Sequence, residues 1–261
     1  MTRRRPRRRV SLYVAHRWAG ALAALFVLFI ATTGLVLNHA ADWRLDRQPV
    51  RSDLLLDAYG IDVPLPGSGF RVDAHWISAS AGTTYWDTRP VGSTGALLGV
   101  ARTQRRVLAV GREAALLLDD EGQLLERSTM TAWPAAIAAL RASSTGFVVT
   151  TPSGEFQTDP DLLSWAPHVV AGDESRLDAE PLPGALAAQI RADARARSIT
   201  WERVLLDLHS GRLPGRAGVL IADLVALAMI GLALSGLGLW VRHLKRQRAQ
   251  QQASGRHRAG P

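Results

Sequence analysis

The sequence predicts an integral membrane protein of the α+β class, in which two transmembrane helices flank a mainly β extracytoplasmic domain. Three observations predict this fold class. Two long blocks are almost free of charge, both ends of the chain are strongly basic, and the middle contains short β-like runs separated by turn residues. The chain has 261 residues and a formal net charge of +8, which is distributed unevenly.

Two apolar blocks are long enough to cross a bilayer. The first runs from Trp18 to Asn38, and the second runs from Ala217 to Val241 with Asp223 as its only charged residue. An α-helix rises about 1.5 Å per residue, so about 20 apolar residues cross the ~30 Å of membrane hydrocarbon. We therefore predict transmembrane helices at residues 12–40 and 215–241. The first block is too long for the apolar part of a signal peptide, and we expect it to be retained.

The charge distribution predicts which parts of the chain stay in the cytoplasm. Seven arginines and no acidic residue precede Ala19, and residues 242–261 carry five arginines, one lysine and no acidic residue. Residues 41–216 carry 18 arginines against 22 acidic residues. Because basic flanks are retained inside, the tails 1–11 and 242–261 are predicted to be cytoplasmic and the middle segment to lie outside.

In a cell with two membranes, this topology puts the middle segment in the periplasm. The basic tails then contact anionic lipid headgroups, and that role accounts for the high net charge without nucleic-acid binding. The tail 242–261, which is rich in glutamine, arginine and glycine, is expected to be disordered.

The middle segment, residues 41–214, is predicted to be one mainly β domain. At about 170 residues it is large enough to bury a core of its own. Glycine, proline, aspartate and serine separate its apolar runs. The predicted strands are Ala74–Ala79, Thr83–Asp87, Ala96–Val100, Arg106–Val110, Ala114–Leu118, Gln123–Glu126, Gly146–Thr151 and Val204–Leu208. Two helices are predicted, at Pro134–Arg141 and Gly184–Arg197, and no catalytic constellation is recognised in this segment.

Four of the seven histidines lie at the ends of the two apolar blocks. His16 and His243 are at the cytoplasmic ends, and His39 and His209 are at the outer ends. Each membrane face thus has one histidine from each helix, and two imidazoles are what a six-coordinate b-type haem iron needs. The chain has no cysteine, so thiolate metal sites and iron–sulfur clusters are not expected. A second interpretation is that the four histidines are interfacial anchors with an apolar body and a polar tip.

Two considerations limit the haem hypothesis. His16 and His39 are 23 residues apart and point about 140° away from each other on a regular helix. In addition, two helices alone would leave a haem exposed to lipid, so a homodimer or other inner-membrane subunits are expected as partners. Asn38 and Asp223 are the candidates for side chains that contact the ligating histidines without binding the haem themselves. Asp223 could orient a histidine, carry protons, or bond the Thr32 and Thr33 hydroxyls.

Motifs at both predicted helices resemble those of the PepSY-associated transmembrane family. The first pattern is H-R-W-x-G at His16–Gly20 with T-G-L-x-L-N-H at Thr33–His39. The second is D-L-H-S-G-R-x-x-G at Asp207–Gly215 with L-S-G and a final Leu-Trp at Leu234–Trp240. The resemblance implies an inner-membrane protein, a PepSY-like segment near residues 185–214, and a link to iron and siderophore handling. It also places His16, His39, His209 and His243 on the motif histidines.

Larger relatives in this family have four or more spans and look like haem-bearing reductases that deliver electrons to ferric siderophores. This chain has only two spans, as in the small members. Two hypotheses follow from the resemblance and the histidines. The first is an electron conduit with haem b, a component of a membrane ferric reductase. The alternative is a non-catalytic, anchored periplasmic domain that acts as an accessory or regulatory subunit.

Overall fold

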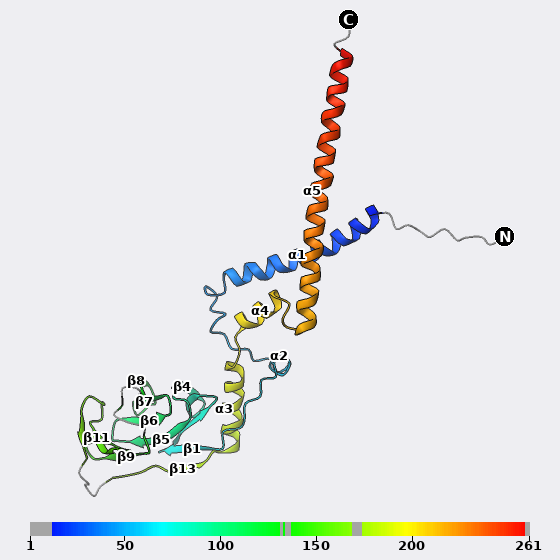
Figure 1. Cartoon of the computed structure of the whole chain (residues 1–261). Helices are drawn as coiled ribbons and strands as arrows, with labels where there is room; N and C mark the ends of the chain where they lie inside the picture. Colours follow the sequence, from blue (N-terminus) through cyan, green and yellow to red (C-terminus); the bar gives the residue numbers. More distant parts are fainter. Residues whose placement is uncertain (1–11, 131–132, 134–136, 169–173, 259–261) are drawn as a thin grey trace, which may run out of the picture. The chain divides into compact units, whose positions relative to one another are not determined.

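A computed structural model describes residues 12–130, 133, 137–168 and 174–258 of the chain (Figure 1). At the two ends of the long helices it describes the backbone only, for Leu12, Tyr13, Ala15, His16, Leu239, Arg242 and residues 246–258. The chain forms two compact units. We call Met1–Gln48 together with Thr200–Pro261 the helical unit, and Pro49–Ile199 the β unit.

The helical unit contains α1 (Leu12–Asn38), α4 (Trp201–His209) and α5 (Arg216–Arg258). Two segments are long and apolar enough to cross a membrane, Arg17–Asn38 and Arg216–Lys245, and only 6% of each is buried. Side chains such as Leu220, which is 63% exposed, would be costly in water but are stable in lipid. The predicted fold class is confirmed: two candidate transmembrane helices flank a mostly β region.

Helix α5 is longer than the sequence predicts. It contains 43 residues, which corresponds to about 65 Å at 1.5 Å per residue and exceeds the ~30 Å of hydrocarbon. The expectation of a disordered tail after residue 242 differs from the structure, because α5 continues to Arg258. Alanine, glutamine and arginine dominate this extension and are all good helix formers. The basic segment 1–11 and residues 259–261 lie outside the described residues.

The β unit contains three antiparallel sheets. The first has the order β13-β1-β2-β3-β4, the second β5-β6-β7-β8 and the third β12-β11-β10-β9. The strands of the first sheet are β1 (Ser68–Val72), β2 (His75–Ser80), β3 (Thr83–Trp86), β4 (Arg89–Ser93) and β13 (Ala179–Pro181). Those of the second are β5 (Leu97–Arg102), β6 (Val107–Gly111), β7 (Ala114–Leu118) and β8 (Leu124–Thr129). Those of the third are β9 (Ala139–Ser143), β10 (Gly146–Thr151), β11 (Gly154–Thr158) and β12 (Trp165–Pro167).

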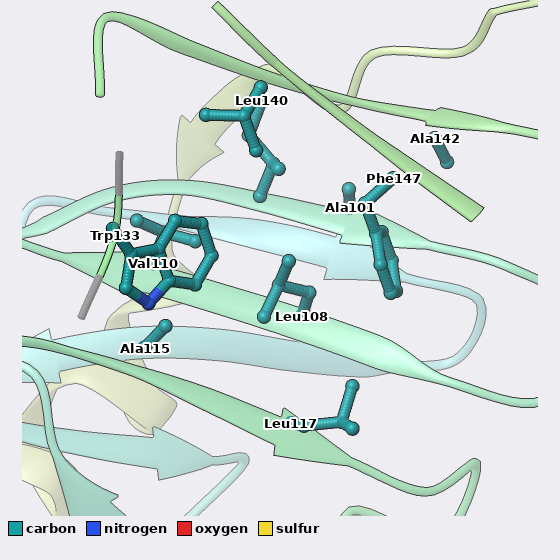
Figure 2. Packing of buried hydrophobic residues seen from close by; sticks show 10 residues of the cluster. Ala101, Leu108, Val110, Ala115, Leu117, Trp133, Leu140, Ala142 and Phe147 are labelled. Carbon is teal, nitrogen blue, oxygen red and sulfur yellow. The ribbon is translucent and has the colours of Figure 1, made fainter. Parts of the chain in front are cut away.

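The second sheet is the central layer, because both of its faces are covered. All residues of β6 and β7 are buried. Alternate residues of a strand point to opposite faces. One face, with Leu108 and Leu117, packs against Phe147 of the third sheet, and Figure 2 shows these side chains converging. The other face, with Leu116 and Leu118, packs against the first sheet in a second apolar cluster.

Two helices complete the β unit. Helix α3 (Gly184–Arg197) packs against the first sheet through Ile190 and Ala194, which contact the fully buried Tyr85. The Tyr85 hydroxyl donates a hydrogen bond to Asp193 on α3, 3.1 Å away. The short α2 (Asp53–Ala58) is joined to α3 by ion pairs from Arg195 to two aspartates. These contacts fix α3, the part of the predicted PepSY-like segment that belongs to this unit.

The structure confirms several predicted elements and corrects two. β7, β10 and α3 have the predicted bounds. The predicted strand Val204–Leu208 is wrong, because these residues lie in α4, whose first turn is capped when the Thr200 side chain accepts a hydrogen bond from the Arg203 backbone N–H. The predicted helix Pro134–Arg141 is wrong at its end, since β9 begins at Ala139 and pairs with β10. Residues 134–136 lie outside the described residues.

Candidate functional site

The candidate site lies within the helical unit, where α4 contacts the last turns of α1. The ring of His209 ends α4, and its Nδ1 lies 2.8 Å from Oγ1 of Thr33 on α1. A Cβ added to Gly34 would stand 3.4 Å from Cε1 of His209, so the missing side chain lets the ring lie against the helix backbone. Thr33 is buried at this contact, which joins residues 176 positions apart in the sequence.

The Thr33 hydroxyl is shared between the backbone of its own helix and the ring of His209. It lies 3.0 Å from the carbonyl oxygen of Phe29 and 3.1 Å from that of Ile30, as well as 2.8 Å from Nδ1 of His209. Carbonyl oxygens only accept, so when the hydroxyl proton is donated to one of them, Nδ1 of His209 must be the donor to the hydroxyl. In that tautomer of the neutral ring, Nε2 carries the lone pair that a metal ligand needs.

His39 has the same arrangement at the end of α1. Its Nδ1 lies 3.2 Å from Oδ2 of Asp42, and a carboxylate accepts the Nδ1 proton. Its ring also stacks on Trp43, with ring centroids 5.6 Å apart. Helix α1 ends at Asn38, and the backbone N–H of His39 bonds to Val36 in a tighter turn. The regular-helix angle between His16 and His39 therefore does not apply.

The loop after α4 is held by a buried carboxylate and by glycines. Asp207 is 4% exposed and pairs with Arg203 at 2.9 Å, and its carbonyl oxygen accepts the backbone N–H of Arg212 at 2.7 Å. Gly211 has φ +71°, and a Cβ there would stand 2.9 Å from the carbonyl oxygen of Gly218. The D-L-H-S-G-R pattern thus forms a tight turn that joins α4 to the start of α5.

The comparison with protein families places this loop and α5 in one family. Residues 97–260 match the family described as the PepSY-associated TM region, which covers more than half of the chain. The chain belongs to this family. Searches among curated proteins and among solved structures find no match.

The PepSY-associated match covers only some of the predicted site residues. It contains His209, Asp223 and His243, whereas His16 and His39 precede residue 97. The resemblance at the first motif therefore depends on the residues of α1 themselves. His209, in the matched region, meets Thr33 in the unmatched helix, so the two motifs share one contact in the folded chain.

The structure places the other predicted residues apart from this contact. Asn38 is exposed at the last position of α1, and His243 is exposed on α5. The side chain of His16 lies outside the described part of the molecule. Asp223 is exposed on α5, and within the described residues it makes no hydrogen bond or ion pair. Thr32, which the sequence offered as a partner of Asp223, donates instead to the Leu28 carbonyl at 2.8 Å.

No larger metal cluster accompanies these histidines. In the part of the chain that the structure describes, no group of three or more histidine, cysteine, aspartate or glutamate side chains is placed to hold a metal ion. The outer histidines are single donors, each with one ring nitrogen already hydrogen-bonded.

The β unit contains a cluster of charged side chains that the sequence analysis did not predict. On the third sheet of the β unit, Arg141 pairs with Glu155 at 2.7 Å and with Glu174 at 2.6 Å. The hydrogen bond from Arg141, followed by that from Thr150, holds the pKa of Glu155 below its usual range. The ring of His168 is almost fully buried against Glu174. Alternating polar residues along β11 were the available signal, and they indicate a polar sheet face.

Proposed function

We propose that this PepSY-associated protein is a component of a membrane reductase that binds haem b through its histidines and conducts electrons across a bacterial inner membrane. Its physiological role would be the reduction of iron or ferric siderophores in the periplasm. The observation that carries the proposal is the hydrogen bonding of the outer histidines. Both Nδ1 atoms are engaged, by Thr33 and by Asp42, and in the neutral Nδ1–H tautomer each Nε2 offers a lone pair.

The residues present fit a b-type haem in donor chemistry. His39 and His209 would hold it at the outer end of the helices, and the proposal assigns His16 and His243 to the inner end. A haem bound there supplies one-electron redox chemistry. The hydroxyl of Thr33 and the carboxylate of Asp42 would hold the orientation of the two rings, as groups behind metal ligands commonly do.

The exposure of the helices supports a site that is completed by other chains. Only 6% of each candidate span is buried, so two helices leave a bound porphyrin largely uncovered. A second copy or other inner-membrane subunits would supply the missing cover. The basic tails support a cytoplasmic location for both termini, and with that topology the β unit would lie in the periplasm.

The absorption spectrum of the purified protein tests this proposal. The full chain is expressed with ample haem supply and purified in detergent. A Soret band, with separate α and β bands on reduction, supports the proposal when the bands are lost in His209→Ala. His168→Ala is the matched control, because His168 lies in the β unit, and it should keep the spectrum.

The alternative is an anchored, non-catalytic accessory subunit, and one observation favours it. The β unit contains three antiparallel sheets, and many of its charged groups form ion pairs with one another, as in the Arg141–Glu155–Glu174 cluster. Such a domain suits binding to a partner protein. A colourless protein that remains folded and membrane-bound under the same conditions would favour this alternative and would contradict haem binding.

A further inference from the structure

A groove at the start of α5 contains two arginines for which membrane topology gives no reason. Arg212, Gly215, Arg216, Val219 and Leu220 line it. Positive charges are normally retained on the cytoplasmic side. These two lie at the opposite end of the span Arg216–Lys245 from the basic tail. Their presence at this end of the helix needs another explanation.

The two guanidinium groups are not used to hold the fold together. Arg212 and Arg216 are exposed, and neither forms an ion pair within the residues that the structure describes. Arg203, one helix earlier, instead pairs with the buried Asp207 at 2.9 Å. The loop contacts of Arg212 use its backbone, since its N–H donates to Asp207 and its carbonyl accepts from Gly215.

The walls of the groove are apolar and continue into the membrane span. Val219 and Leu220 are both exposed, at 37% and 63%. At 100° per residue, Arg216, Val219, Leu220 and Asp223 lie on one face of α5. Asp223 lies about 10 Å further along α5 than Arg216, which is seven residues at 1.5 Å each. Its carboxylate is therefore not beside a phosphate that the two arginines would bind. The groove therefore offers positive charge at the membrane edge and apolar surface below it.

We infer that this groove binds the headgroup of an anionic phospholipid, with Arg212 and Arg216 on the phosphate and an acyl chain along Val219 and Leu220. Guanidinium groups form charge-assisted hydrogen bonds to phosphate oxygens, often two at once. Each basic residue near an anionic membrane surface strengthens binding about 5-fold. Charge complementarity selects an anionic lipid over a zwitterionic one. The inference does not depend on haem binding, and only the choice of leaflet depends on the proposed topology.

Native mass spectrometry of the full chain in detergent tests the inference, with phosphatidylglycerol and phosphatidylethanolamine as probes. The wild type is expected to retain phosphatidylglycerol preferentially. Arg212→Gln with Arg216→Gln should weaken this binding about 25-fold, and each single change about 5-fold, while phosphatidylethanolamine binding stays the same. Arg212→Lys with Arg216→Lys should keep most of the binding, because it keeps both positive charges. Retained binding in this variant also shows that substitution at these two positions does not unfold the protein.

Two controls make the result decisive. The pair Arg105→Gln and Arg112→Gln removes the same charge from exposed positions of the β unit and should leave lipid binding unchanged. Inorganic phosphate should not displace phosphatidylglycerol, because it cannot use the apolar wall. Unchanged binding in the Arg212/Arg216 double variant would overturn the inference. So would an equal loss in the control pair, or full displacement by inorganic phosphate. A colourless protein would leave it standing.

Discussion

Leucine side chains are buried in the β unit and exposed on the long helices of the helical unit. Leu116, on β7 in the central sheet, is fully buried between two layers. Leu234, on α5, is 66% exposed. In the β unit, protein covers both faces of β6 and β7. In the helical unit, almost nothing covers α1 or α5 except at their contact with each other and with α4. The first unit carries its own apolar environment, and the second requires lipid to supply it.

This difference also separates where each unit can carry function. The β unit uses most of its charged groups for its own stability. The helical unit leaves polar groups at the ends of its helices, namely the outer histidines and the paired arginines of the groove. Within the described residues, the two arginines form no ion pair, and each outer histidine has only one ring nitrogen in a hydrogen bond. These groups are available to a lipid or a cofactor, and this is why both proposals concern the helical unit.

The largest expected difference comes from shortening one leucine in each unit. Leu116→Ala should lower the free energy of unfolding of the β unit by about 2–5 kcal/mol, because it leaves a cavity between two sheets. Leu234→Ala, the matched change on α5, should leave that unfolding unchanged. Urea unfolding of the full chain in detergent, followed by tryptophan fluorescence, measures both. Similar losses in the two variants would contradict the contrast between the units.

The contact between α3 and the first sheet gives the next effect. Tyr85→Phe removes the hydrogen bond to Asp193 and should cost about 1–2 kcal/mol. Burial, with the neighbouring Asp193, raises the pKa of Tyr85 to about 12. The protonated form is favoured in the folded state, so this contribution is complete below pH 10 and is lost as the pH rises to about 12. Unfolding measured across this range should show the decline in wild type and not in Tyr85→Phe.

A smaller effect concerns the orientation of His209. Thr33→Val removes the hydroxyl that accepts the Nδ1 proton and should cost about 1 kcal/mol. ¹⁵N NMR of the imidazole should report a single Nδ1–H tautomer in wild type and a mixture in the variant. Thr32→Val is the control, since that hydroxyl bonds only to the backbone of its own helix. A wild-type ring with its proton on Nε2 would contradict the assignment of the outer donor atoms.

The smallest effect is expected for Glu155, whose carboxylate is partly exposed. Its lowered pKa means that ionisation stabilises the folded β unit above the usual glutamate pKa. That stabilisation is lost as the pH falls through the lower, folded-state pKa. Glu155→Gln should therefore be less stable than wild type at neutral pH, and the difference should disappear in acid. Denaturant titrations at the two pH values measure this, with Glu126→Gln on the exposed β8 as control.

Local patterns were sufficient to predict much of the fold. The uninterrupted apolar blocks predicted α1 and α5, and helix formers between Pro183 and Ser198 predicted α3 with its observed bounds. Val204–Leu208 was misread because its apolar residues suit a strand, whereas burial of Val204 and Asp207 three positions apart reflects a helix that packs on one side. The sequence could not reveal which sheets stack, because that depends on contacts between distant strands.

The sequence named the histidines of the candidate site but did not predict the hydrogen bonds that orient them. The first span predicted that His39 follows the end of α1, whereas His209 lies at the end of α4 and not on the second span helix. The hydrogen bonds that orient them did not follow, because Thr33 and His209 are brought together by a helix that the sequence failed to predict. The haem ligands remain a prediction for all four histidines.

The pairing of β13 with β1 has a consequence for the order in which the protein is made. Ser68 pairs with Pro181, so the first sheet lacks its last strand until almost the whole β unit has been synthesised. The central sheet can form its hairpins early, but neither face is covered until the flanking sheets are present. Folding of this region is thus expected to finish just before α5 leaves the ribosome. A nascent chain that stalled before residue 179 would leave the edge of β1 without its partner strand and Tyr85 without the cover of Ile190 and Ala194.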